Sequence, residues 1–186
     1  MAYGVDPARY GQDKTAIARL VGVVLESLDY YAKQSTMETA GRVAATVDKD
    51  TSVAIDVIGI GAGVFDRLQE QDYNVQAVNV GEATDITDRS GKVQFVNLRS
   101  AVWWKLRDAL NPDNADIIAI PDDPLLIGDL TAPLWTYTSN GRVKVESKDD
   151  IRKRIGRSTD GADALALAYH ALTLSGSILL DGYDYD

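Results

Sequence analysis

Short runs of apolar residues in the first half of this chain predict strands, and longer periodic segments predict helices. The run Ser52–Ile58 is almost continuously apolar, as in a strand that is buried on both faces of a sheet. Ser35 or Thr36 can cap a helix that carries Glu38 in its first turn. We therefore expect strands at 3–7, 15–21, 23–32, 52–58 and 75–80, and helices at 36–47 and 64–71.

The second half begins with a polar segment, 81–92, which is expected to be a mobile loop. Asn140-Gly141 lies between two β-rich runs and is a strong hairpin signal. Ser147, with Asp150 three residues later, resembles a capping box, and Ser158 is expected to cap the last helix. The expected elements are helices at 97–110, 123–130, 148–155 and 159–174, a strand at 117–120, and a hairpin formed by 134–138 and 142–146. This order predicts the α/β class, with a mixed sheet covered by helices.

Length and composition limit the kinds of site that the chain can form. Its 186 residues suit one domain, expected over 1–176, and the acidic segment 177–186 is expected to be a flexible tail. The chain has no cysteine and one histidine, which excludes thiolate and histidine-rich metal sites. Any bound metal would have carboxylate ligands, which favours Mg²⁺ or Mn²⁺. No apolar run is long enough to cross a membrane and no signal peptide is visible, so no membrane partner is expected.

Four aspartates occur where an isolated carboxylate would be costly. Asp56 lies within an apolar strand, and Asp6 ends the first strand. Asp163 lies inside an almost wholly apolar helix, and Asp160 shares its face three residues earlier. Each could instead cap a turn or interact with the helix dipole, which explains Asp160 well and Asp163 poorly. Together they can converge at one end of a sheet and hold two metal ions that clamp a phosphodiester.

Several motifs, in this order and spacing, resemble the nuclease domain of the large terminase subunits of tailed bacteriophages. The resemblance runs from about Tyr3 to Leu172. Its motifs are Gly4-Val5-Asp6-Pro7, Asp13-Lys14-Thr15-Ala16-Ile17, Ala54-Ile55-Asp56 with Gly59-Ile60-Gly61-Ala62-Gly63, Ser147-Lys148-Asp149, and Arg154 through Ser158 and Asp160-Gly161-Ala162-Asp163-Ala164-Leu165. The resemblance implies a ribonuclease H-like fold with an added β-hairpin before the C-terminal helices. It also implies cleavage of concatemeric viral DNA with two Mg²⁺ or Mn²⁺ ions.

By motif position, the resemblance makes Asp6, Asp56 and Asp163 the catalytic metal ligands, with Asp6 bridging both ions. Asp160 matches an accessory ligand position that varies in the family. The implied partners are double-stranded DNA, the terminase ATPase domain, the small terminase subunit and the portal, in the cytoplasm of the infected bacterium. The chain has no phosphate-binding G-x-x-x-x-G-K-[ST] motif, so we expect an isolated C-terminal domain without translocation activity.

A basic stretch stands out in a chain whose net charge is −9. Although such a run is often only a solvated surface, its place before the Asp160–Asp163 helix favours contact with the DNA backbone. The expected DNA-binding residues are Arg142, Lys144, Lys148, Arg152, Lys153, Arg154 and Arg157.

Other readings of the same pattern remain open. A transposase or Holliday-junction resolvase core would share the acidic cluster, and a non-catalytic docking domain could keep the fold. Sugar kinases and actin-like ATPases also begin with a strand, an early aspartate and a hairpin, but they need a second similar half. The glycines at 59–63 are interpreted as a tight turn rather than a dinucleotide site, and His170 as structural. Of Trp103 and Trp104, one is expected in the core and the other half-buried.

Overall fold

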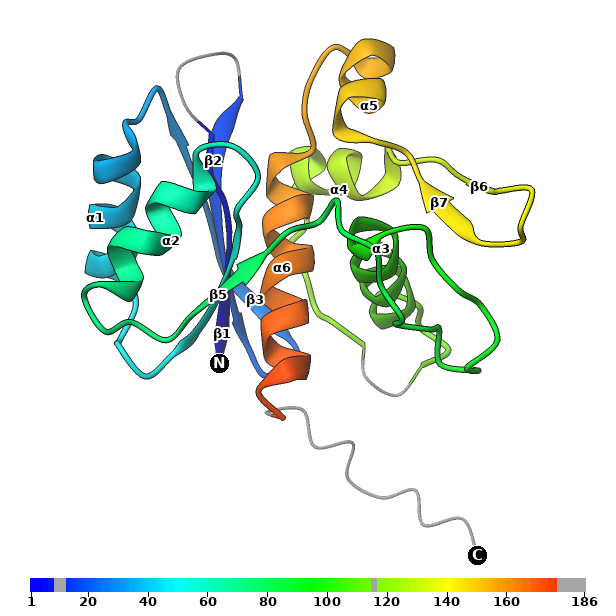
Figure 1. Cartoon of the computed structure of the whole chain (residues 1–186), viewed down its shortest axis with the longest axis horizontal. Coiled ribbons are helices and arrows are strands. Elements are labelled where there is room, and N and C mark those ends of the chain that lie inside the picture. Colours follow the sequence, from blue (N-terminus) through cyan, green and yellow to red (C-terminus); the bar gives the residue numbers. More distant parts are fainter. Residues whose placement is uncertain (9–12, 115–116, 177–186) are drawn as a thin grey trace, which may run out of the picture.

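A five-stranded mixed sheet forms the centre of the computed structural model, which describes residues 1–8, 13–114 and 117–176 (Figure 1). Its order is β3-β2-β1-β4-β5, with β1 antiparallel to β2 and parallel to β4. The pair β2–β3 is antiparallel and the pair β4–β5 is parallel. The strands are β1 (Ala2–Asp6), β2 (Lys14–Val21), β3 (Val24–Ala32), β4 (Ser52–Asp56) and β5 (Val75–Val78). The five strands predicted in the first half of the sequence are therefore present.

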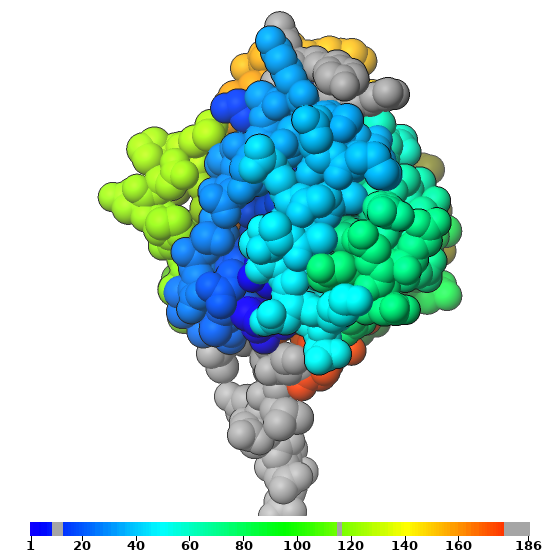
Figure 2. Space-filling view, turned by 90° about the vertical axis from the view of Figure 1, so that its left-hand side faces the viewer, coloured from blue at the N-terminus to red at the C-terminus, as the bar shows by residue number. Residues whose placement is uncertain are grey.

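Helices cover both faces of this sheet. On one face lie α1 (Thr36–Thr46) and α2 (Gly61–Gln69), whose outer surface is seen in Figure 2. The other face is covered by α6 (Asp160–Leu174), which lies between the sheet and α3 (Leu98–Ala109) in Figure 1. Of the two caps predicted for α1, Ser35 is the one present, and it forms a capping box, because Ser35 and Glu38 each accept a hydrogen bond from the other's backbone N–H. The glycine-rich segment enters the helix earlier than predicted, since α2 begins at Gly61.

The two faces of the central strands differ in side-chain size. Tyr3 and Val5 of β1 point towards α1 and α2, in a core that also contains Ile17 and Ile55. The face towards α6 carries mainly small residues, among them Ala16, Ala18 and Ala54. These let the backbone of α6 approach the sheet. At Gly4 the approach is so close that a Cβ atom would overlap the carbonyl oxygen of Ala164.

The remaining elements lie beyond α6 and complete one end of the molecule. They are α4 (Pro124–Thr131), the hairpin β6 (Trp135–Tyr137) and β7 (Val143–Val145), and α5 (Lys148–Ile155). Residues 81–92 form no helix or named strand. The strand predicted at 117–120 is wrong: only Ala119 bridges to Val24, and Pro121 then removes the next backbone donor. The tail predicted at 177–186 lies outside the described residues. No helix in the described ranges is long and apolar enough to cross a membrane.

Candidate metal centre

Two of the predicted aspartates end neighbouring parallel strands. Val5 of β1 is in register with Ile55 of β4, so Asp6 and Asp56 follow side by side at the carboxyl edge of the sheet. Asp6 is 4% exposed, whereas Asp56 is partly buried and accepts a hydrogen bond of 3.0 Å from the Ile58 N–H. Both line one cavity of about 390 Å³, together with Lys148.

The other two aspartates lie in the first turn of α6, which begins at the same edge of the sheet. Asp160 and Asp163 are each 7% exposed. The predicted cap is wrong by one residue: Thr159 is the N-cap, and its hydroxyl donates to Asp163 Oδ2 at 2.9 Å instead of capping the helix. Ser158 donates to Asp160 Oδ1 at 2.5 Å. Acidic groups here also interact favourably with the helix dipole.

Lys148, the first residue of α5, connects the two pairs. Its Nζ atom is bonded to Asp6 Oδ2 and lies 3.3 Å from Asp160 Oδ1 and 3.7 Å from Asp163 Oδ2. One ammonium group therefore lies among three carboxylates that come from β1 and α6. Its side chain is 30% exposed and thus remains accessible from the surface.

Burial and charge shift the pKa values of this cluster in different directions. Burial raises the pKa of Asp6 to about 7, because the nearby Asp163 and Asp160 add to it and Lys148 only partly opposes it. Burial also raises the pKa of Asp56. For Asp163 burial would raise the pKa, but Arg99 and Lys148 outweigh it and the pKa is lowered. The pKa of Lys148 is raised, since the carboxylates outweigh its burial.

Arg99 and Trp103 belong to this cluster, although the sequence analysis did not identify them as site residues. Arg99 Nη1 donates to Asp163 Oδ1 at 2.5 Å, and Trp103 Nε1 donates to the same oxygen at 2.8 Å. Both come from α3. Trp103 and Trp104 are 7% and 9% exposed, so the expectation that one of them is half-buried is wrong. The available signal was an arginine in the first turn of a helix that continues with the apolar run Ala101–Trp104.

The donor set suits a hard divalent cation, since four carboxylates lie at one edge of the sheet and three of them already surround a cationic group. As the side chains lie, no three acidic or histidine residues of the described ranges form a ready-made metal site. The ammonium group of Lys148 occupies the space among Asp6, Asp160 and Asp163. A metal ion there would have to displace or share that group.

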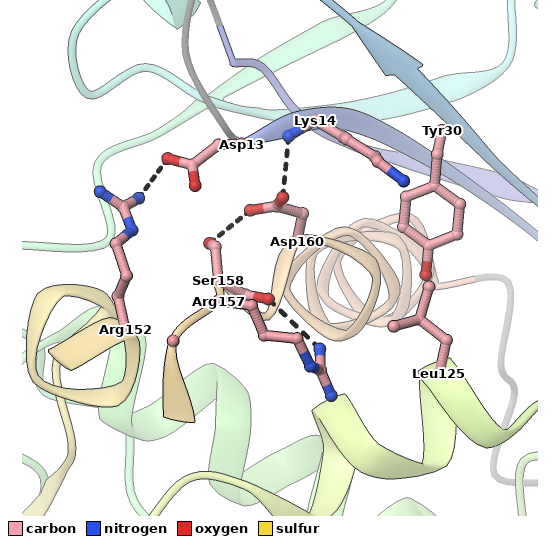
Figure 3. Close-up of a pocket in the computed structure, with 9 residues that line it drawn as sticks. Asp13, Lys14, Tyr30, Leu125, Arg152, Arg157, Ser158 and Asp160 are labelled. Carbon is pink, nitrogen blue, oxygen red and sulfur yellow. Dashed lines mark hydrogen bonds and ion pairs between the residues drawn. The ribbon is translucent and has the colours of Figure 1, made fainter. Parts of the chain in front are cut away.

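Asp160 also lines a second cavity, of about 220 Å³ (Figure 3). Asp160 Oδ2 accepts from the Lys14 backbone N–H at 2.9 Å, whereas Oδ1 is the oxygen near Lys148 Nζ. Arg152 and Arg157 line this second cavity. Each is also held by a carboxylate, Arg152 by Asp13 and Arg157 by Asp129.

The predicted DNA-binding residues fall into three groups. Lys148 faces the aspartates, and Arg152 and Arg157 face the second cavity. The third group lies on the hairpin and the outer side of α5, where Arg154 pairs with Glu146 and Lys153 with Asp150. It consists of Arg142, Lys144, Lys153 and Arg154.

Comparison with known proteins gives no match to any family model and none to a curated protein. Solved structures do match. The nuclease domain of the large terminase subunit gp2 of bacterial virus Sf6 has 18% identity and a TM-score of 0.70, over 91% of this chain and 87% of that chain. The large terminase nuclease of thermophilic phage G20c, with bound magnesium, has 17% identity and a TM-score of 0.61, over 91% and 79%.

The nuclease domain of the large terminase of Thermus phage P74-26 matches with 18% identity and a TM-score of 0.61, over 99% of this chain and 83% of that chain. Mutant forms of the Sf6 domain have been solved with manganese or calcium, and the G20c nuclease with cobalt. These identities are too low to carry an activity across, but the folds agree over most of both chains. This chain therefore has the ribonuclease H-like fold of the nuclease domains of phage large terminase subunits.

Proposed function

We propose that this chain is the nuclease domain of a bacteriophage large terminase subunit and cuts double-stranded DNA with divalent metal ions. The observation that carries the proposal is the convergence of Asp6, Asp160 and Asp163 on one cationic group, with Asp56 on the wall of the same cavity. A buried acidic cluster of this kind is costly unless cations neutralise it. The shared fold and the metals in the matched structures support the same reading.

In this proposal, Asp6, Asp56 and Asp163 hold two Mg²⁺ or Mn²⁺ ions, and Asp160 is an additional ligand. Bound there, the ions would generate hydroxide from water and stabilise the leaving oxygen of the phosphodiester. The chain's own residues bind the ions and fix their positions. Asp6 and Asp56 lie at the ends of neighbouring strands, and Asp163 comes from the first turn of α6, which covers one face of the sheet. No protein nucleophile is then needed.

The basic residues are proposed to hold the DNA backbone beside this cluster. Arg152 and Arg157 line a cavity that shares Asp160 with the metal site, so phosphates bound there would lie next to the scissile one. Lys144 and Lys153 are exposed on the hairpin and on α5. Replacing both with alanine should weaken DNA binding and flatten the slope of log K against log salt concentration by up to about 2. Arg67→Ala on α2 is the control, and an unchanged slope in the double variant would contradict the assignment.

The proposed substrate, location and partners follow from the proposed identity as a terminase nuclease domain. The substrate would be concatemeric viral DNA in the cytoplasm of the infected bacterium. The partners would be a terminase ATPase domain, a small terminase subunit and a portal. A resolvase or transposase core would instead prefer branched or specific DNA, and a docking domain would need no metal. Substrate preference and metal dependence thus separate these readings.

Cleavage of supercoiled plasmid with Mg²⁺, Mn²⁺ or EDTA, without ATP, tests the proposal. We expect metal-dependent nicking by the wild type, and its loss in Asp6→Asn and Asp163→Asn. Asp66→Asn, which changes an exposed aspartate of α2, is the matched control and should cut like the wild type. Equal cutting by all four proteins would refute the assigned site, and metal-independent cutting would refute the mechanism.

A further inference from the structure

Arg99 is a buried cation in a chain whose other arginines lie nearer the surface, at least within the described ranges. It is 8% exposed and lies in the first turn of α3. Its backbone N–H donates to the carbonyl oxygen of Val80 at 2.8 Å, and Asn97 caps the helix through the Ser100 N–H. The start of α3 is thus attached to the segment that follows β5. The guanidinium group projects from a fixed point into the metal centre.

The contacts of Arg99 make the two oxygens of Asp163 unequal. Oδ1 accepts from Arg99 Nη1 at 2.5 Å and from Trp103 Nε1 at 2.8 Å. Oδ2 accepts from the Thr159 hydroxyl at 2.9 Å and lies 3.7 Å from Lys148 Nζ. Two donors from α3 hold Oδ1. Oδ2 is therefore the oxygen that faces the ammonium group of Lys148 and the other aspartates.

We infer that Arg99 is a positioning residue that fixes Asp163 so that a single oxygen, Oδ2, is presented to a divalent cation. This inference rests on the proposed function and deepens it. Groups that bond to a ligating carboxylate set its orientation, and removing them commonly costs 10- to 100-fold, roughly, in metal affinity. Arg99 also holds Trp103, since its guanidinium carbon lies 5.4 Å from the centre of that ring.

The shape of the guanidinium group matters here as well as its charge. Arg99 Nε donates to the carbonyl oxygen of Glu146 at 3.2 Å, just before the cap of α5. One planar group therefore joins α6 to the start of α5, from which Lys148 extends. An ammonium group on a lysine side chain has no such fork. Nη2 is buried without a hydrogen-bond partner among the described residues, and Arg99 lines the cavity of about 390 Å³. The N–H groups of Nη2 can therefore donate to an oxygen that enters the site.

The test is Mn²⁺ binding to the whole chain without DNA, measured by isothermal titration calorimetry for the wild type and Arg99→Lys. The substitution keeps the charge and removes the fork. We expect the dissociation constant for Mn²⁺ to rise about 10-fold or more. The matched control is Arg107→Lys on the same helix, where the side chain is 58% exposed; its dissociation constant should equal that of the wild type.

The outcomes separate a positioning role from other roles. A folded Arg99→Lys variant whose dissociation constant lies within about twofold of the wild type would overturn the inference, since charge alone would then suffice. Should Arg99→Lys not fold, Trp103→Phe decides: it keeps an aromatic ring and removes only the second donor to Oδ1. Weaker Mn²⁺ binding by that variant supports the inference, and unchanged binding overturns it. Absence of Mn²⁺ binding by the wild type would refute the proposed function itself.

Discussion

Replacing Asp6 with asparagine should stabilise the metal-free protein, increasingly so as the pH rises. Asp6 is 4% exposed, and burial raises the pKa of its carboxyl group to about 7 from an ordinary value of 3.8. Between these values the folded protein keeps a proton that the unfolded chain has released. For such a raised pKa, stability falls as the pH rises through this window. Asparagine has nearly the same shape as the protonated acid and carries no charge.

The size of the effect follows from the two pKa values. A tenfold change in proton affinity corresponds to about 1.4 kcal/mol. Between about pH 4.5 and pH 8, ionising Asp6 therefore costs the folded wild type about 3 kcal/mol relative to the unfolded chain. We expect the difference in free energy of unfolding between Asp6→Asn and the wild type to grow by that amount over the same range. Lys148 keeps Asp160 and Asp163 as partners in the variant.

The wild type alone would not reveal this slope, because His170 acts in the opposite direction. Burial lowers the pKa of His170 to about 4 from an ordinary 6.5, so its neutral form stabilises the folded state above that range. As the pH rises from about 4 to about 6.5, this stabilisation appears while that of Asp6 disappears. Comparing the variant with the wild type cancels the contribution of His170.

The assay is urea unfolding of both proteins in EDTA at several pH values, followed by circular dichroism. Saturating Mn²⁺ should stabilise the wild type selectively and remove the advantage of the variant at high pH, because only the native state with its carboxylate binds the metal. A stability difference that stays constant between about pH 4.5 and pH 8 would refute the reasoning. It would mean that Asp6 stays ionised in the folded protein.

Three further predictions concern stability. Gly4→Ala should lower the free energy of unfolding by about 3 kcal/mol, because its Cβ would overlap the backbone of α6. The control is Gly41→Ala, which has open space on α1 and should be neutral or stabilising in the same urea titration. Ser35→Ala should lower the free energy of unfolding by about 1 kcal/mol, because α1 loses its cap. The same urea titration measures it, and an unchanged unfolding midpoint would contradict the prediction. His170→Phe should make the protein more resistant to acid between about pH 6.5 and pH 4, and an acid transition at the wild-type pH would contradict this.

The sequence was sufficient to predict the acidic cluster because strand ends and helix faces follow from local patterns. Asp6 and Asp56 each end an apolar strand, and parallel strands place such ends at one edge. Asp160 and Asp163 are three residues apart, so any helix presents them together. The pairing of β1 with β4, and the packing of α6 so that it begins at the same edge, had to be assumed.

Contacts between distant elements could not be predicted in this way. Arg99 and Asp163 are 64 positions apart, and their meeting depends on how α3 packs against α6. A run of basic residues likewise does not reveal which side chains turn inward: Lys148 was interpreted as a DNA contact, yet its Nζ lies among the aspartates. Whether it also meets DNA stays a prediction. The strand expected at 117–120 is reduced to one bridge between Ala119 and the edge of β3, because Pro121 removes the next backbone donor.

The two cations of the site differ in how firmly they are held, and this difference bears on metal entry. Arg99 is 8% exposed, comes from the anchored start of α3 and donates hydrogen bonds to Asp163 Oδ1 and the carbonyl oxygen of Glu146. Lys148 is 30% exposed, has a flexible side chain and lies on the cavity side, against Asp6, Asp160 and Asp163 Oδ2. A divalent ion that binds to these oxygens competes with Lys148 and leaves the contacts of Arg99 in place. We therefore expect Lys148→Met to lower the stability of the metal-free protein and to tighten Mn²⁺ binding, the reverse of the effect of Arg99→Lys. Weaker Mn²⁺ binding by a folded Lys148→Met variant would show that Lys148 does not compete with the metal ion for these oxygens.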